Sequence, residues 1–360
     1  MIILSPAPLK FFRRMYASSK AIMYSKYGEP HEVLHLVERA LAPIKPDEVT
    51  VKMCAAPIHP SDINTVQGVY PVRGSLPAVG GNEGVGKVVE CGSDVKSLKT
   101  GDFVMPAGLT AGTWQTYLTG KATEFLPVPR SLTVMDAAVF AVNPSTAYRM
   151  LLDFTELHPG DLLVQNGATS AVGIYVIQLT KLLGIRTANI FRPRQTKEET
   201  EKTRQVLLDY GATWALTERE FTDKSSEAAD KIKKVGPAKL ALNCLGGKPA
   251  MVLMKSLGRG GTLVSYGGMT RTPMPVPVGP LIFKDIRLCG FWISDWIMNH
   301  DASERQKMLD KLGNWFSTKS LRASPFEAVH IEDWQKAINM SMFTDSQPTG
   351  LKKKAVLVMD

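Results

Sequence analysis

Apolar residues change their spacing twice along the middle of the chain. Residues 161–166 form a short apolar run after Pro159-Gly160, as expected for a buried parallel strand. Apolar side chains then recur on one helical face, at Val172, Val176, Leu179 and Leu183. A second apolar run covers 187–191. The pattern predicts a strand, a turn over 167–173, a helix and a second strand, which make half of a nucleotide-binding fold.

The same alternation continues to about residue 290. Further helices are predicted at 198–210, 226–234 and 250–257. Further strands are predicted at 213–216, 240–244, 262–266 and 286–291. Together with the opening unit, these elements predict a doubly wound parallel sheet of six strands.

The first third of the chain has a different pattern. Short apolar runs are separated by glycine and proline, at 21–24, 34–38, 48–56, 84–91, 102–105 and 114–118. Frequent turns without helices between them favour a β-rich, barrel-like domain. A helical stretch over 131–153 would then carry the chain into the second domain.

The C-terminal part is expected to return to the first domain. Residues 274–280 are rich in proline and should lack regular structure. Helices are predicted at 302–316 and 331–342, followed by a returning strand at 355–359. The sequence thus predicts an α/β protein with a discontinuous, β-rich catalytic domain and an inserted nucleotide-binding domain. The catalytic domain would comprise 21–144 and 291–360, and the nucleotide-binding domain 145–290.

Composition narrows the class of protein. The chain has 360 residues, of which 44% are hydrophobic and 21% charged, as in soluble globular proteins. No apolar stretch approaches the roughly 20 residues of a membrane helix, so no membrane span is expected. The net charge is +9, and removal of residues 1–16 would take away three positive charges and leave +6. That modest excess suits acidic substrates better than nucleic acid. The cysteines form no CxxC pair or disulfide framework and are expected to be packed thiols: Cys54, Cys91, Cys244 and Cys289.

The N-terminus resembles a targeting segment. The first 28 residues contain no acidic residue and five basic ones, Lys10, Arg13, Arg14, Lys20 and Lys26. Serine and apolar residues fill the gaps, which matches a mitochondrial presequence over residues 1–20. The alternative is a disordered basic tail. A presequence would place the protein in the mitochondrial matrix, but its cleavage site cannot be predicted.

The turn after the first strand of the nucleotide-binding unit suits a diphosphate. Its small residues let the backbone approach an anion, and the helix that follows supplies free N–H groups and a partial positive charge. The second strand ends at Arg192-Pro193-Arg194, where an acidic residue would bind a ribose 2′-hydroxyl. Guanidinium groups there favour a 2′-phosphate, so the cofactor is expected to be NADPH rather than NADH. The alternative is a tight turn followed by two surface arginines.

Several motifs together identify a family. Residues 80–95 (GGNEGVGKVVECGSDV), Gly101-Asp102 and the 167–173 turn resemble the medium-chain dehydrogenase/reductase superfamily. The closer signatures resemble its mitochondrial 2-enoyl thioester reductases, at 63–70, 76–84, 143–151, 242–247, 266–269 and 283–292. The resemblance implies a GroES-like catalytic domain, a Rossmann domain and a homodimer. It also implies NADPH-dependent reduction of the C2–C3 double bond of trans-2-enoyl thioesters, carried by acyl-carrier protein or coenzyme A, in mitochondrial fatty-acid synthesis.

The chain departs from the zinc-containing members of the superfamily. Asn82 stands where those enzymes carry a histidine, and no cysteine falls near 57–62 or Asn143. Zinc requires three or four converging nitrogen or sulfur ligands. His59 is the nearest histidine, and a lone His-Pro is interpreted as a loop residue. No metal is therefore expected.

Without a metal, another group must stabilise the charge that forms on the substrate. Hydride addition to the β-carbon of an enoyl thioester produces an enolate, whose oxygen needs a hydrogen-bond donor and whose α-carbon needs a proton. Tyr70 matches the catalytic tyrosine of the family. A phenol with an unperturbed pKa of about 10 is protonated at neutral pH and can donate. The alternative is that Tyr70 only completes a turn.

The resemblance also implies cofactor-binding residues. Asn143 would reach the nicotinamide-side ribose or the phosphates, and Lys354 would complete the pocket, although it could equally be a solvated lysine. Thr169, Ser170, Ala171 and Val172 would line the diphosphate turn, and Arg192, Pro193 and Arg194 would hold the 2′-phosphate. Two further segments would line the nicotinamide and the acyl channel: Tyr266, Gly267, Gly268 and Met269, and Phe291, Trp292 and Ile293.

Two other functions are compatible with the sequence. A quinone or enone reductase of the same superfamily would keep the NADPH site without a dedicated acid. A nucleotide-binding partner protein that has lost catalysis would have no reason to keep both Tyr70 and the cofactor turn. The preferred acyl-chain length, and the choice between acyl-carrier protein and coenzyme A, cannot be predicted from the sequence.

Overall fold

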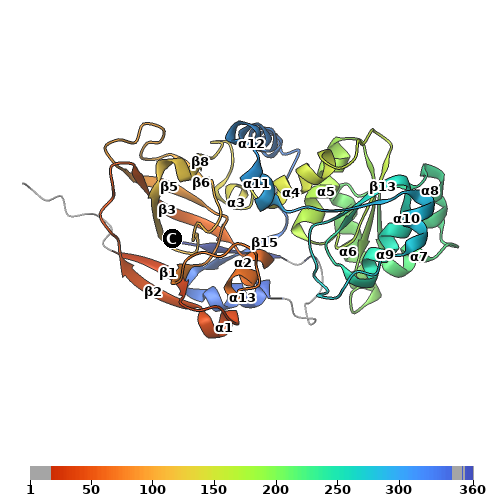
Figure 1. The fold of residues 1–360 in the computed structure, drawn as a ribbon, viewed down its shortest axis with the longest axis horizontal. Coiled ribbons are helices and arrows are strands. Elements are labelled where there is room, and N and C mark those ends of the chain that lie inside the picture. Colours follow the sequence, from red (N-terminus) through yellow and green to blue (C-terminus); the bar gives the residue numbers. More distant parts are fainter. Residues whose placement is uncertain (1–17, 343–350, 352, 360) are drawn as a thin grey trace, which may run out of the picture.

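The computed structural model describes residues 18–342, 351 and 353–359, and these form two domains lying side by side (Figure 1). Most of the predicted presequence, residues 1–17, lies outside the described residues. Strand β1 (Ser18–Tyr24) begins inside the range assigned to the presequence. Ser19 is buried there and Ser18 pairs with Ala40, so the folded domain starts earlier than predicted.

The nucleotide-binding domain contains the predicted six-stranded sheet. Every neighbouring pair of strands is parallel, and the order is β11-β10-β9-β12-β13-β14, with a switch point beside β9. The strands are β9 (Leu162–Gln165), β10 (Arg186–Phe191), β11 (Trp214–Thr217), β12 (Ala238–Asn243), β13 (Leu257–Ser265) and β14 (Arg287–Gly290). The helices are α5 (Ala171–Leu182), α6 (Lys197–Tyr210), α7 (Glu218–Thr222), α8 (Glu227–Val235), α9 (Gly247–Ser256) and α10 (Val278–Lys284). The predicted Rossmann fold is confirmed.

One prediction in this domain needs correction. Residues 274–280 were expected to lack regular structure, but α10 begins at Val278. Pro277 is the residue that precedes the helix, and Pro280 lies in its first turn. Proline is tolerated at both places because the first backbone N–H groups of a helix have no intrahelical partner.

The catalytic domain is built from two sheets. A seven-stranded sheet has the order β15-β16-β3-β5-β6-β8, with β7 also paired to β3, and a three-stranded sheet has the order β2-β1-β4. The strands not yet given are β2 (His35–Ala40), β3 (Glu48–Pro57), β4 (Ala78–Val79), β5 (Val85–Cys91), β6 (Phe103–Pro106), β7 (Tyr117–Lys121), β8 (Phe125–Pro127), β15 (Phe326–His330) and β16 (Lys354–Val358). The predicted β-rich domain is confirmed, but β7 begins at Tyr117 and not at Trp114.

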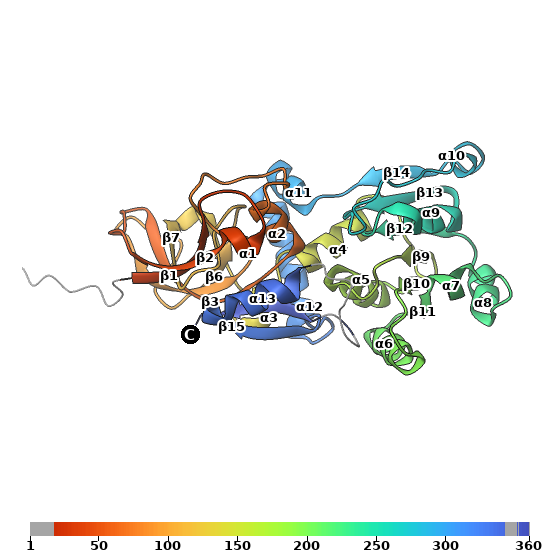
Figure 2. The same cartoon turned by 90° about the horizontal axis from the view of Figure 1, so that it is seen from below.

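Short helices interrupt the N-terminal strands, contrary to the expectation of turns alone. The α-helices are α1 (Pro30–Val33), α2 (Pro60–Val66), α3 (Val134–Ala138), α4 (Asn143–Leu152), α11 (Ile293–Asn299), α12 (Ala302–Ser317) and α13 (Trp334–Ser341). The 3-10 turns are η1 (Ala122–Glu124) and η2 (Ile331–Asp333). Helix α13 packs against β15 and β16, α3 packs against β3, and α4 lies between the two domains (Figure 2).

The crossing between the domains is made by two helices and not by one. The predicted helix over 131–153 is broken after Ala138, and α4 begins at Asn143 with Pro144 in its first turn. Proline favours the start of a helix over its interior. Helix α4 packs against α5, so its first residue lies where the catalytic domain meets the nucleotide-binding domain (Figure 2).

The C-terminal strand returns to the catalytic domain, as predicted. Strand β16 runs antiparallel to β3, with Val356 opposite Pro57 and Val358 opposite Ala55. This pairing brings Lys354 beside the end of β3, although the whole nucleotide-binding domain lies between them in sequence. None of the helices described by the structure is both long and apolar enough to cross a membrane.

Candidate active site

The turn between β9 and α5 has the form expected for a diphosphate site. Gly167 has φ +60°, and a Cβ added to it would lie 2.2 Å from Cys244 Sγ. A Cβ on Gly173 would lie 2.8 Å from the Ala168 carbonyl oxygen, so both positions require glycine. Ser170 caps α5 by accepting a hydrogen bond from the Gly173 amide at 3.1 Å. The half-buried residues predicted to line the turn all lie here: Thr169, Ser170, Ala171 and Val172.

The two arginines predicted to bind a 2′-phosphate follow β10. Arg192 and Pro193 are exposed, and Arg194 is half-buried, with its Nε 3.4 Å from Thr203 Oγ1. Burial, and then the charge of Arg192, lower the pKa of Arg194. The two guanidinium groups therefore repel each other, and a doubly charged anion between them would remove that cost.

The ends of β12 and β13 complete the same edge of the sheet. The Met269 amide donates to the Cys244 carbonyl at 3.0 Å, which folds the segment after β13 over the end of β12. Tyr266 lies near Ser170 and Cys244, and burial raises the pKa of its phenol. No atom would approach a Cβ on Gly268 within 4 Å, while a Cβ on Gly267 would crowd the Cys244 carbonyl. These residues thus lie at the carboxyl edge of the sheet, where dinucleotides bind.

Asn143 carries the polar group that fits a cofactor. It is the first residue of α4, it is buried, and its Nδ2 has no hydrogen-bond partner within the protein. The buried Ser145 hydroxyl also has no hydrogen-bond partner within the protein. Buried polar groups are normally paired, so two orphaned groups at the start of α4 fit a polar ligand that is bound in function. Together with the glycine turn, they show that the chain fits NADPH.

Tyr70 follows α2 and contacts Trp292, which lies between β14 and α11, where the chain returns from the nucleotide-binding domain. Its hydroxyl oxygen accepts a hydrogen bond from Trp292 Nε1 at 2.6 Å, and the two rings meet edge to face with centroids 5.8 Å apart. Burial raises the pKa of Tyr70, although the neighbouring Trp292 and Ser294 act in the opposite direction. The phenol therefore remains protonated at neutral pH, which a proton donor requires.

A cavity of about 70 Å³ joins Tyr70 to the domain crossing. Its walls come from α2, the β4–β5 loop, the start of α4 and α11, including Tyr70, Asn82, Glu83, Val142, Ile293 and Ser294. Of the predicted channel residues, Ile293 lines this cavity and Trp292 bonds to Tyr70, while Phe291 packs edge to face on Phe154.

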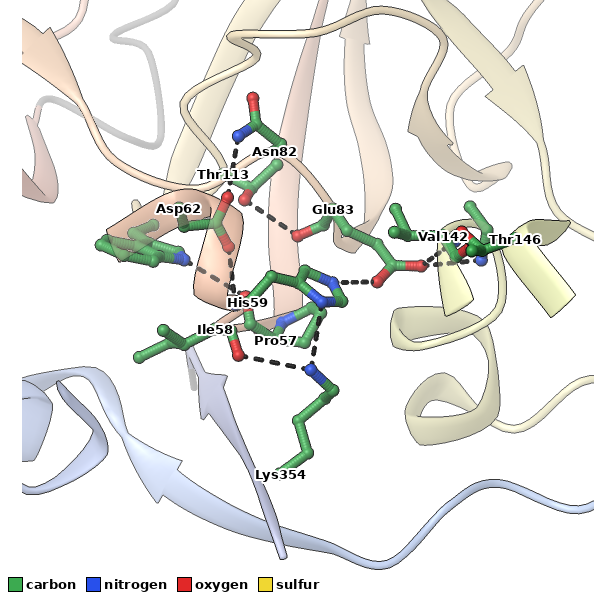
Figure 3. A network of polar contacts seen from close by, with 12 residues as sticks. Pro57, Ile58, His59, Asp62, Asn82, Glu83, Thr113, Val142, Thr146 and Lys354 are labelled. Carbon is green, nitrogen blue, oxygen red and sulfur yellow. Dashed lines mark hydrogen bonds and ion pairs between the residues drawn. The ribbon is translucent and has the colours of Figure 1, made fainter. Parts of the chain in front are cut away.

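A buried polar network that forms part of the cavity wall was not predicted from the sequence. It consists of His59, Asp62, Asn82, Glu83 and Lys354 (Figure 3). His59 Nε2 lies 2.6 Å from Glu83 Oε2, and His59 Nδ1 lies 3.0 Å from Lys354 Nζ. Lys354, predicted to complete the cofactor pocket, is thus placed on His59 and not among the residues of the nucleotide-binding turn. His59 was interpreted as a loop residue, yet it is buried and precedes the first residue of α2.

Asp62 ties the same network to α2. Its Oδ2 accepts from the His59 amide at 2.8 Å, and its Oδ1 accepts from Asn82 Nδ2 at 2.8 Å. Burial raises the pKa of Asp62, although His59 and these hydrogen bonds act in the opposite direction. The sequence does contain a signal for α2. Pro60 is the first residue of the helix and Asp62 the third, and both residue types are favoured at those positions.

Within residues 18–342, 351 and 353–359, no three His, Cys, Asp or Glu side chains are grouped so that they could hold a metal ion. None of the four cysteines forms a disulfide; Cys244 is buried, and the other three are partly buried. In Cys244, burial raises the pKa of the thiol to about 11.

Family models match both domains of the chain. The model of the alcohol dehydrogenase GroES-like domain matches residues 45–130. The model named zinc-binding dehydrogenase matches residues 171–313. The two matches correspond to the β-rich sheet and to the parallel sheet described above.

Individual relatives and solved structures match almost the whole chain. The mitochondrial enoyl-[acyl-carrier-protein] reductase of Rattus norvegicus is 42% identical over 90% of this chain and 85% of its own length. The corresponding protein of Homo sapiens is 42% identical over 91% of this chain and 86% of its own. The solved mitochondrial 2-enoyl thioester reductase Etr1p/Etr2p heterodimer from Candida tropicalis superimposes with a TM-score of 0.85 at 32% identity, covering 95% and 99% of the two chains. The solved complex of Etr1p with NADP and crotonyl-CoA matches with the same TM-score, identity and coverage. The chain belongs to the mitochondrial enoyl-[acyl-carrier-protein] reductases of the medium-chain dehydrogenase/reductase superfamily.

Proposed function

We propose that the protein is a mitochondrial NADPH-dependent reductase of trans-2-enoyl thioesters, with Tyr70 as the group that donates to the developing enolate. The observation that carries this proposal is the protonated, half-buried Tyr70 hydroxyl, held by Trp292 at the wall of the cavity between the domains. The named relatives, and the Etr1p complex with NADP and crotonyl-CoA, support the same cofactor and substrate class.

Tyr70 is oriented for donation by its neighbour. Because Trp292 Nε1–H donates to the phenol oxygen, the hydrogen of the Tyr70 hydroxyl points away from Trp292, toward Ser294 or a substrate in the cavity. NADPH supplies a hydride to the β-carbon of the enoyl group. Tyr70 then stabilises negative charge on the thioester oxygen, or delivers the proton that the α-carbon requires.

Three groups of residues hold the cofactor in this proposal. The turn from Gly167 to Gly173 presents backbone N–H groups to the diphosphate, and Arg192 and Arg194 bind the 2′-phosphate. The Asn143 amide, which has no partner in the protein, donates to the nicotinamide side of the cofactor.

A direct assay tests the proposed reaction. Purified protein is mixed with NADPH and either crotonyl-CoA or a simple quinone, and the oxidation of NADPH is followed at 340 nm. We expect turnover of crotonyl-CoA to exceed that of the quinone by more than about tenfold, because only an enoyl thioester uses the Tyr70 donor. Faster turnover of the quinone would support a quinone reductase, and no turnover of either would support a partner protein without catalysis.

The assembly proposed here is a homodimer formed through the edge of the nucleotide-binding sheet. Strand β14 is the last strand of that sheet, and α10 beside it exposes Val278, Ile282 and Phe283 by 63%, 66% and 77%. An unpaired edge next to exposed apolar residues suits a second copy of the chain related by twofold symmetry.

Sedimentation of a charged variant tests this assembly. The double variant Ile282→Asp, Phe283→Asp should be monomeric at micromolar concentration, while wild type is dimeric. Leu182→Asp, an exposed apolar position on α5, is the matched control and should remain dimeric. A dimeric double variant would assign the interface to another surface.

A further inference from the structure

Glu83 uses both oxygens of a carboxylate that is almost fully buried. Its side chain is 2% exposed. Oε1 accepts from the backbone amides of Ala141 and Val142, at 2.7 Å each, and Oε2 lies 2.6 Å from His59 Nε2 (Figure 3). Charge-assisted hydrogen bonds of this kind are strong, and a buried carboxylate without them would be costly.

Lys354 determines which nitrogen of His59 carries the hydrogen. The Lys354 ammonium lies 3.0 Å from His59 Nδ1 and can only donate hydrogen bonds. Nδ1 must therefore accept, and the hydrogen of the neutral imidazole must reside on Nε2, facing Glu83.

The two amides held by Glu83 come directly before Asn143. Val142 is the N-cap residue of α4, and its side chain makes no capping hydrogen bond to the helix. Glu83 supplies that cap from the β4–β5 loop, and its negative charge lies at the positive end of the helix. The first side chain of α4 is Asn143, whose buried Nδ2 has no partner in the protein.

We propose that Glu83 is a positioning residue that sets the direction of the Asn143 amide toward the cofactor, and that Lys354 and His59 keep Glu83 in place by fixing the histidine tautomer. This rests on the cofactor contact proposed above for Asn143. Glu83 itself does not touch the reacting atoms in this assignment.

Replacing Glu83 by glutamine tests whether both carboxylate oxygens are needed, one for the two backbone amides and one for His59. A glutamine amide has one acceptor oxygen, so it cannot accept from both His59 and the amides of residues 141 and 142. We expect Glu83→Gln to weaken NADPH binding roughly tenfold in a fluorescence titration, equal to the loss of about 1.4 kcal/mol. Glu220→Gln, on the surface of the nucleotide-binding domain, is the matched control and should bind as wild type does. Binding by Glu83→Gln within twofold of wild type would overturn the proposal.

A double-mutant cycle tests whether the effect passes through Asn143. In the Asn143→Ala background, Glu83→Gln should weaken NADPH binding less than twofold further, because the group that it positions is gone. Additive losses would show that Glu83 acts by another route. These titrations contain no enoyl thioester, so they remain decisive even if the proposed reaction fails.

His59 offers a conservative variant that separates positioning from general packing. In His59→Gln the amide nitrogen can donate to Glu83 while its oxygen accepts from Lys354, so NADPH binding should stay within about threefold of wild type. His59→Leu removes both bonds and should bind as weakly as Glu83→Gln. Equal behaviour of the two His59 variants would contradict the proposed hydrogen-bond order.

The tautomer can also be measured in the wild-type protein, whatever the folding of the variants. Two-bond proton–nitrogen spectra of histidine-labelled protein should show His59 neutral, with its hydrogen on Nε2. A hydrogen on Nδ1, or a doubly protonated ring, would overturn the assignment.

Discussion

The diphosphate turn and the buried polar network both stabilise charged groups, but they do so with different chemical groups. The turn uses backbone N–H groups and two glycines that lie within seven consecutive residues. The network uses side chains of five residues spread from His59 to Lys354. A backbone site is determined by local conformation, whereas a side-chain site depends on the complete fold.

This difference assigns distinct tasks to the two domains. The turn accepts any ligand that carries a diphosphate, and the arginines after β10 select among such ligands. In the proposed assignment, Tyr70 acts on the substrate once the cofactor is bound, and the network acts on cofactor binding through Asn143. Variants of Tyr70 and variants of the cofactor-binding residues should therefore separate turnover from cofactor affinity.

The largest effect is expected from Tyr70→Phe. Loss of the hydroxyl removes the proposed donor, and general acid groups contribute roughly 10²–10⁴-fold to rate, so kcat for crotonyl-CoA should fall by at least about 100-fold. The dissociation constant of NADPH should stay within twofold, because Tyr70 is outside the nucleotide-binding turn. Steady-state kinetics and NADPH titration measure the two quantities.

A matched tyrosine variant controls for the loss of a hydroxyl elsewhere. Tyr210→Phe, at the end of α6, should leave both quantities unchanged. Turnover by Tyr70→Phe equal to that of wild type would remove Tyr70 from the mechanism.

The next effect is expected from Arg192→Ala combined with Arg194→Ala. Only NADPH carries the 2′-phosphate, and two charge-assisted contacts to it are worth about 1.5–3 kcal/mol each before the repulsion between the arginines is subtracted. We expect NADPH binding to weaken by roughly 100-fold and NADH binding by less than threefold. Equal losses for both cofactors would contradict this assignment, and Arg186→Ala, at the exposed start of β10, is the control.

Elements that depend on contiguous residues could be predicted from the sequence. Strands β9 to β13 follow short apolar runs, and their order follows from the alternation of strand and helix. The glycine turn was visible because both its glycines and the helix after it are adjacent in sequence.

The break between α3 and α4 was missed because its cause lies elsewhere in the chain. Residues 139–142 separate the two helices, and the amides of Ala141 and Val142 are bound by Glu83, which is about 60 residues earlier. The environment of His59 was missed for the same reason, since both of its partners come from distant strands and loops. Sequence periodicity reports burial along one element and contains no information about such contacts.

A moderate effect on stability is expected from Gly167→Ala. An alanine at φ +60° costs about 1–2 kcal/mol, and its Cβ would overlap Cys244 Sγ, so the free energy of unfolding should fall by about 2–4 kcal/mol. Gly101→Ala is the matched control, because Gly101 also has a positive φ but no atom within 4 Å of an added Cβ. Denaturant unfolding of both variants separates the strain that they share from the overlap at Gly167. Equal losses would show that Cys244 moves away at no cost.

The smallest effect is expected from raising the pH. Tyr70 must be protonated to donate, and burial raises its pKa above the ordinary tyrosine value of about 10. Deprotonation, which would abolish donation, therefore begins only above that value, so kcat for crotonyl-CoA should vary by less than twofold between pH 7 and pH 9. A decline in kcat that starts near pH 8 and is absent from Tyr70→Phe would mean that the phenol ionises more easily than its burial allows. The network would then have to supply positive charge to the cavity, and Lys354 is its cationic member.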